Sequence, residues 1–442
     1  MRTFMIVLAL VAVLDARAES LVFDGVRLID VDRATVSDPT RVGIRDGFIV
    51  DASTIDHPDR AVTTHGYLIP GLTEMHAHVP PVRAGDQVVR DTLSLWLAHG
   101  VTTIRGMLGE PGHLQLRQQL ADGELAGPRL ITSGPSFNGQ SVTSPAQARR
   151  SVLAQQEAGY DFLKLHPGLS APAFDAMSLA ADALGIDYSG HVSVAVGLDR
   201  VFASRQATID HLDGYARLMV PEGHTLHGTD PGLFGVNLIK GMAPGLIPEL
   251  ARRTAEAGIA NVPTQSLIEN WMTGDIEALM QRDAMRWIPP ETAARWRDQA
   301  VRRREDVTPD DAERYITLRR QLIGALHDAG AMILAGADSP QILSIPGDAI
   351  HHELLTYVDS GLTPAEALAT ATTNVAAYLG ETSRGCLQPG CVADLVLLTA
   401  NPLQDIGNTR AIAGVMRAGK WFDRQQLDET LTALADRVQG RD

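Results

Sequence analysis

Residues 69–78 read Ile-Pro-Gly-Leu-Thr-Glu-Met-His-Ala-His, an apolar run that ends in two histidines one residue apart. Side chains at alternate positions of a β-strand point to the same side, so His76 and His78 can reach one metal ion from the end of a single strand. A His-x-His pair by itself is weak evidence, because short polar repeats arise by chance. Here the pair follows a Pro-Gly dipeptide and an apolar run, which predicts a metal site at the end of a buried strand.

Downstream of the histidine pair, apolar strand-like segments alternate with amphipathic helical segments about eight times, the pattern of a parallel (β/α)8 barrel. Residues 146–158 and 173–184 are examples of the helical segments. Two connections, residues 213–258 and 264–330, are unusually long. The charged helical sequence of the second connection predicts a solvated helix face, whereas long loops on a barrel can instead form lids and substrate walls. The predicted strands are residues 68–75, 101–105, 129–132, 162–166, 186–191, 208–211, 259–263 and 332–335.

Short strands and turns precede and follow the barrel segment. Asp46-Gly47, between two apolar runs, is a hairpin signal, and similar strand-like runs follow residue 393. Residues 351–361 and 364–379 predict helices that close the barrel. The fold class is therefore α/β, a TIM-type barrel with a small β-sandwich module built from both chain ends. The predicted boundaries are 19–68 for the first part of the module, 69–380 for the barrel, and 381–442 for the second part of the module with a terminal helix.

The first residues predict a leader. Arg2 precedes an apolar run over residues 4–14, and Ala16-Arg17-Ala18 is a small-residue cleavage pattern. So short an apolar run does not span a bilayer as a helix. We predict a signal peptide, residues 1–18, cleaved after Ala18, a periplasmic or secreted location, and no stable membrane insertion after cleavage. The alternative is an uncleaved membrane anchor.

Charge and composition limit the partners. The formal net charge of −15 argues against nucleic acid or an anionic membrane as the main partner, because both repel an acidic surface. A small-molecule substrate is the remaining expectation, and the sequence leaves open whether the chain forms a homo-oligomer. The two cysteines, Cys386 and Cys391, flank the turn signal Pro389-Gly390, which predicts a small disulfide in an oxidising compartment. Two unpaired thiols are the alternative, since disulfide geometry is demanding.

Four further candidate ligands follow the histidine pair, each near the end of a predicted strand: Lys164, His191, His211 and Asp338. Active sites of (β/α)8 barrels lie at the C-terminal ends of the strands. The topology therefore brings all the candidates to the same face of the barrel, and together they predict a metal centre.

With these residues in this order, the chain resembles the amidohydrolase superfamily, in particular its imidazolonepropionase-like and prolidase-like branch with two metal ions. The resemblance spans nearly all of the chain after the leader. It implies that His76, His78 and Asp338 hold the more buried metal ion. It further implies that Lys164, carboxylated by carbon dioxide, bridges both ions, and that His191 and His211 hold the second one.

The resemblance implies a hydrolytic chemistry. Two divalent ions lower the pKa of a bound water toward about 7 and polarise the substrate carbonyl, while Asp338 transfers the proton to the leaving group. Zinc is the expected metal for imidazole ligands, with manganese, cobalt or iron as alternatives. We predict a hydrolase that cleaves an amide or peptide bond of a dipeptide or N-acyl amino acid. A lactonase or phosphotriesterase is the alternative, followed by a one-metal deaminase and a non-catalytic binding barrel.

Four residues are candidates for substrate contact. His166 lies two residues beyond Lys164 and should face the same side of its strand. Arg105, at the end of the second strand, suits either a substrate carboxylate or a structural ion pair. Tyr215 and Gln265 lie just beyond the sixth and seventh strands and are predicted to line the pocket.

Overall fold

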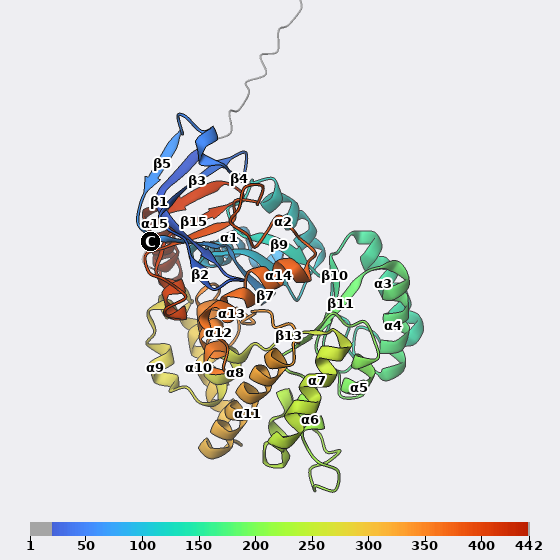
Figure 1. Cartoon of the computed structure of the whole chain (residues 1–442). Coiled ribbons are helices and arrows are strands. Elements are labelled where there is room, and N and C mark those ends of the chain that lie inside the picture. The colour runs from blue at the N-terminus through green and yellow to red at the C-terminus, as the bar shows by residue number, and fades with distance from the viewer. Residues whose placement is uncertain (1–19, 441–442) are drawn as a thin grey trace, which may run out of the picture.

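The computed structural model describes residues 20–440 (Figure 1). The predicted signal peptide lies outside the described residues. Strands from the two chain ends form one sheet, drawn in blue and red in the figure, and the barrel with its helices lies beside it. Within residues 20–440, no helix has the length and apolar character needed to cross a membrane.

The end module confirms the predicted union of the two chain ends. Its sheet has the strand order β16-β15-β14-β6-β1-β3-β4, with β2 and β5 paired to β1. The central strand β6 runs parallel to β1 and antiparallel to β14, so it joins the N-terminal strands to the C-terminal strands. The strands are β1 Leu21–Asp30, β2 Thr35–Val36, β3 Thr40–Arg45, β4 Phe48–Val50, β5 Arg60–Thr63, β6 Tyr67–Pro70, β14 Leu395–Leu398, β15 Ile412–Arg417 and β16 Lys420–Asp423.

The hairpin predicted at Asp46-Gly47 joins β3 to β4. Arg45 pairs with Phe48, so the loop has two residues, and both have positive φ, 54° at Asp46 and 80° at Gly47. Two-residue hairpin turns of this kind match the right-handed twist of their strands.

The barrel contains seven strands, all in parallel pairs, and a closing segment. Parallel bridges connect Ser133 to Phe162, Asn261 to Ile333 and Ala77 to Ser339. The predicted eighth strand, residues 332–335, is therefore present only as bridged segments that close the barrel. The strands are β7 Leu72–Ala77, β8 Val101–Gly106, β9 Arg129–Thr132, β10 Phe162–Leu165, β11 Asp187–Gly190, β12 Thr208–Asp210 and β13 Ala260–Val262.

The prediction of a single strand over residues 68–75 is wrong. The apolar run is shared by β6 in the end module and β7 in the barrel, with Gly71 between them. A Cβ atom on Gly71 would lie 2.1 Å from Oγ1 of Thr102, so only glycine lets the backbone pass from one sheet to the other. The run is continuous in apolar character because both strands are buried. The sequence pattern therefore does not show where the chain passes from one sheet to the other.

Helices α3 and α4 correspond to the predicted segments 146–158 and 173–184. Ser144 and Ser170 cap their N-termini, and Gly159 and Gly185 end them with positive φ. The helices are α1 Asp86–Ala98, α2 Pro111–Ala121, α3 Pro145–Ala158, α4 Ala171–Leu184, α5 Gly197–Phe202, α6 Tyr215–Leu218, α7 Ile247–Ala257, α8 Gln265–Met272, α9 Ile276–Met280, α10 Pro290–Arg304, α11 Pro309–Asp328, α12 Asp348–Asp359, α13 Pro364–Thr370, α14 Thr373–Tyr378 and α15 Arg424–Val438.

The predicted closing helix over residues 364–379 is divided into α13 and α14. The carbonyl groups of Thr370 and Ala371 accept hydrogen bonds from the backbone N–H groups of Ala335 and Thr73. Because these carbonyls bond to the barrel, they are not available to continue the helix. The long connections also contain helices, and α11 from the second connection packs against α7 from the first.

Candidate metal centre

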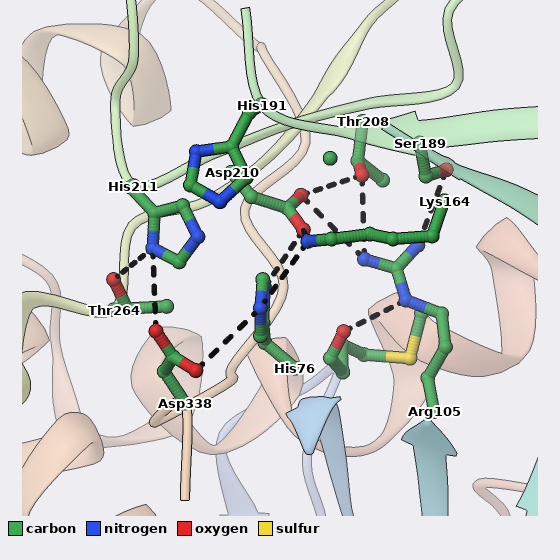
Figure 2. Close-up of polar contacts among 12 residues, drawn as sticks. His76, Arg105, Lys164, Ser189, His191, Thr208, Asp210, His211, Thr264 and Asp338 are labelled. Carbon is green, nitrogen blue, oxygen red and sulfur yellow. Dashed lines mark hydrogen bonds and ion pairs between the residues drawn. The ribbon is translucent and has the colours of Figure 1, made fainter. Parts of the chain in front are cut away.

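The predicted ligands come together at the C-terminal ends of the barrel strands. Figure 2 shows His76, His211 and Asp338 pointing toward one another. The Oδ1 atom of Asp338 lies 2.6 Å from Nε2 of His78 and 3.7 Å from Nε2 of His76. The Nζ atom of Lys164 lies 3.4 Å from Nε2 of His76.

The second histidine pair completes this cluster. The ring centroids of His76 and His211 are 4.5 Å apart, and those of His191 and His211 are 4.4 Å apart. The ends of β7, β11 and β12 thus place His76, His211 and His191 against one another, as a shared metal centre requires.

The donor set fits a divalent cation. His76, His211 and Asp338 each present one ligand atom, and these atoms lie within 4.8 Å of one another. The Nε2 atom of His211 is buried and has no hydrogen-bond partner among residues 20–440. A buried polar atom without a partner is costly, and a cation at this position would satisfy it.

The opposite ring nitrogens of three histidines have partners that the sequence analysis did not identify. Nδ1 lies 2.8 Å from Oδ2 of Asp210 in His76, 2.6 Å from Oδ2 of Asp213 in His191, and 2.9 Å from Oγ1 of Thr264 in His211. Such partners fix the ring and leave Nε2 for a metal ion. The two aspartates flank His211 in the sequence, which was an available signal, whereas nothing marked Thr264.

A buried arginine holds the ends of two strands. Arg319 of α11, with 3% of its surface exposed, donates from Nη1 to the carbonyl oxygen of His211 at 2.8 Å and from Nη2 to that of Pro263 at 2.9 Å. His211 and Thr264 have φ of 62° and 48°, a left-handed conformation that non-glycine residues rarely adopt. The hydrogen bonds of Arg319 support the backbone at this strained point.

Burial changes the acid–base properties of the centre. Burial of Lys164 lowers its pKa from 10.5 to about 8, and burial places the pKa values of His76 and His211 well below the ordinary value. Neutral imidazole and neutral amine are the forms that can act as ligands or be carboxylated. Gly190 leaves room for the lysine, because a Cβ atom there would lie 3.2 Å from Nζ.

Arg105 and Tyr215 do not lie where the predicted substrate contacts require them. Arg105 is 2% exposed, and its guanidinium donates to the carbonyl oxygen of Met75 at 2.7 Å and lies 3.6 Å from Asp210. The structure thus has the structural ion pair, the alternative left open for Arg105. The hydroxyl of Tyr215 is buried and lies 2.8 Å from Oγ1 of Thr254.

The side chain of Gln265 also forms its contact in the interior of the protein, since its Oε1 accepts a hydrogen bond from Nε of Arg319 at 2.8 Å. The sequence position was right, just beyond a strand, but burial directs the side chain inward. His166 alone among the four candidates is partly exposed beside the centre, with its ring stacked 5.2 Å from that of His191. Burial lowers the pKa of His166 to about 2, so its imidazole is neutral.

A parallel α/β barrel with a β-module from both chain ends, and with histidines, a lysine and an aspartate at its strand ends, defines a class of hydrolases. A family model named Amidohydrolase family matches residues 67–422, and the chain belongs to that family. It is therefore a hydrolase of the class that acts on C–N bonds.

Solved structures show the same fold at low sequence identity. Bottromycin amidohydrolase has a TM-score of 0.72 at 23% identity, with 96% of this chain and 91% of that chain covered. A protein from Bifidobacterium longum assigned as a prolidase has a TM-score of 0.67 at 22% identity, covering 94% and 99%. A Xaa-Pro dipeptidase with bound methionine has a TM-score of 0.64 at 18% identity, covering 92% and 100%. No curated protein matches the sequence.

Proposed function

We propose that this protein is an exported, binuclear metal-dependent hydrolase that cleaves an amide or peptide bond in a small molecule, of the dipeptide or N-acyl amino acid type. The observation that carries the proposal is the buried cluster of His76, His211 and Asp338, whose ligand atoms lie within 4.8 Å of one another. Similar folds occur in proteins named as a prolidase and a Xaa-Pro dipeptidase, which supports this choice of substrate.

In the proposed centre, His76, His78 and Asp338 would hold one divalent ion, His191 and His211 would hold the other, and carboxylated Lys164 would be a ligand of both. The neutral amine of Lys164 adds to carbon dioxide and releases a proton, which converts a potential cation into an anionic oxygen ligand. When bound, the two ions lower the pKa of the attacking water and polarise the scissile carbonyl.

Asp338 is the proposed proton carrier. Its carboxylate takes the proton of the attacking water and delivers it to the leaving nitrogen. The next residue is fixed by Glu74, whose Oε1 accepts a hydrogen bond from Oγ of Ser339 at 2.9 Å. Trp96 holds the same glutamate by donating from Nε1 to Oε2 at 2.7 Å. These contacts support an Asp338 with one defined orientation.

Metal content and one variant test the proposal. Plasma mass spectrometry of protein purified without chelator should find about two divalent ions per chain. Asp338→Asn should reduce kcat on amide and dipeptide substrates by at least about 10²-fold, because loss of general acid–base catalysis has an effect of this size, and the metal should stay bound. Near-normal turnover of this variant would overturn the role of Asp338.

A substrate panel that also contains lactones and phosphotriesters decides between the leading function and its alternative.

Export is tested separately. The proposal that residues 1–18 are a cleaved leader predicts that protein expressed with this segment in a Gram-negative host has Glu19 as its first residue. An N-terminus that still contains residues 1–18 in the exported fraction would contradict cleavage.

A further inference from the structure

An apolar wall, defined here as the rings of Phe234 and Trp271, borders the second histidine pair. The ring centroid of Phe234 lies 5.2 Å from that of His211. It lies 6.4 Å from that of His191, with the two planes only 15° apart. The ring of Trp271 lies 5.3 Å from that of Phe234. Neither aromatic ring takes part in the chemistry described above.

The backbone around Phe234 is held in an unusual conformation. Phe234 has φ of 55°, and Gly235 follows with φ of 88°. A Cβ atom on Gly235 would lie 2.3 Å from Cβ of Ala216, so the segment packs tightly there. The carbonyl oxygen of Phe234 accepts a hydrogen bond from the hydroxyl of the buried Tyr315. A strained residue persists only where its surroundings impose it, and here they place an aromatic ring beside the metal centre.

Trp271 is a rigid support for this ring. Only 6% of its surface is exposed, and the guanidinium carbon of Arg303 lies 4.3 Å above its ring. Its carbonyl oxygen accepts a hydrogen bond from Nε of Arg304 at 2.6 Å. Phe234 itself is only half-buried, so part of its ring remains available for contact.

His191 has two chemically different neighbours beside its ring. Its ring lies near-parallel to the rings of both His166 and Phe234, at interplanar angles of 26° and 15°. His166 offers polar ring nitrogens, whereas Phe234 offers only carbon. A charged or strongly polar group placed against Phe234 would lose hydration without gaining a hydrogen bond, while an apolar group would gain buried contact.

We propose that Phe234 is a specificity-determining residue, and that the substrate carries a bulky apolar group, a branched or aromatic side chain or a ring, next to the scissile amide. This inference rests on the proposed amide hydrolysis and names the substrate class of the same site. Two substrates that differ by a small apolar group in contact with a protein wall differ by about 10-fold to 200-fold in kcat/KM, so the effect is measurable.

The test uses matched substrates and three variants. Two dipeptide series, X-Ala and Ala-X, compare leucine and phenylalanine at X with glutamine and glutamate. The wild-type protein should favour the apolar members of one series by about tenfold or more in kcat/KM. Phe234→Ala should reduce this ratio to near one, and Phe234→Leu should retain most of it. Leu233→Ala, at the neighbouring position with 41% exposure, is the control and should leave the ratio unchanged.

Each result decides the inference. An unchanged ratio in Phe234→Ala with metal content retained would overturn it, and so would an equal loss on polar and apolar substrates. If the wild-type protein hydrolyses no amide, the proposed function fails by itself. Calorimetry with free phenylalanine and glutamine then tests the wall alone. A preference for phenylalanine that disappears in Phe234→Ala supports the wall, and equal binding in both proteins rejects it.

Discussion

Nη1 of Arg319 donates a hydrogen bond of 2.8 Å to the carbonyl oxygen of His211, which connects the outer helix α11 to the metal centre. The same guanidinium bonds to the carbonyl oxygen of Pro263 and to the side chain of Gln265. A single planar group thus sets the relative position of two strand ends. Its geometry determines where the His211 imidazole points.

Replacing Arg319 should selectively weaken the binding of the second metal ion. Lysine carries the same charge but not the planar fork that serves these acceptors together, so Arg319→Lys should lower the affinity of the ion held by His191 and His211 by about 10-fold to 100-fold. A chelator titration with metal analysis resolves the two ions. Arg320→Lys, which alters the partly exposed pair with Glu269, is the control. An equal loss of affinity for both ions would mean that Arg319 supports the fold in general.

Asp213→Asn should also act on the second ion. The substitution keeps the size of the side chain 2.6 Å from Nδ1 of His191 but removes its charge, which lowers the basicity of the imidazole. We expect a fall in metal affinity of about 10-fold to 100-fold with an unchanged melting temperature of the metal-free protein. Asp175→Asn, at an exposed pair with Arg200, is the matched control and should not change affinity.

The carboxylation of Lys164 should depend on pH with a defined sign. Its pKa is lowered to about 8, and only the neutral amine combines with carbon dioxide. At constant dissolved carbon dioxide, the rate of activation of metal-free protein by metal and bicarbonate should rise about tenfold per pH unit up to pH 8 and then level off. Lys164→Ala should show no dependence on bicarbonate. A rate that continues to rise in this way to pH 10 would indicate an ordinary lysine.

The disulfide predicted from the sequence is present between Cys386 and Cys391. Its sequence separation of 5 closes a short loop, which corresponds to about 2 kcal/mol of stability in the chain-entropy model. Reduction, or the double change to serine, should lower the melting temperature by about 2 °C for a chain of this size. Metal content should not change, because the two cysteines pack in the hydrophobic cluster of the end module, which contains none of the proposed metal ligands. Loss of metal on reduction would show that the module and the metal centre are coupled.

The sequence was sufficient to predict the barrel and the six candidate ligands, for a physical reason. Parallel strands are buried on both faces, so they read as short apolar runs, and polar residues that end such runs fall at one rim. His191 and His211 follow β11 and β12 directly. The same reasoning failed at residues 68–75, because burial in two different sheets gives one uninterrupted apolar run.

Asp210 and Asp213 could have been identified from their positions beside His211, but Thr264 and Arg319 could not, because their contacts join distant segments. Gln265 was expected to face the substrate, yet its side-chain oxygen accepts a hydrogen bond from Arg319, 54 residues later in the sequence. Arg319 lies on the apolar face of α11, one turn from Tyr315 and Ile323, so the helical pattern indicates that it is buried but not which oxygen atoms it bonds. Phe234 was not identified for the same reason, since its connection has no periodicity that indicates which residue turns toward the centre.

The position of β6 has a consequence for how the protein matures. β6 continues through Gly71 into the strand that carries His76, and it pairs with β14, which ends at Leu398. Residues at the start of the barrel therefore acquire their final neighbours only after nearly the whole polypeptide has been synthesised. The backbone of His78 likewise bonds to Ser339. A metal ion that arrives before Asp338 has been synthesised meets an incomplete set of ligands, so loading of the centre follows synthesis of that residue.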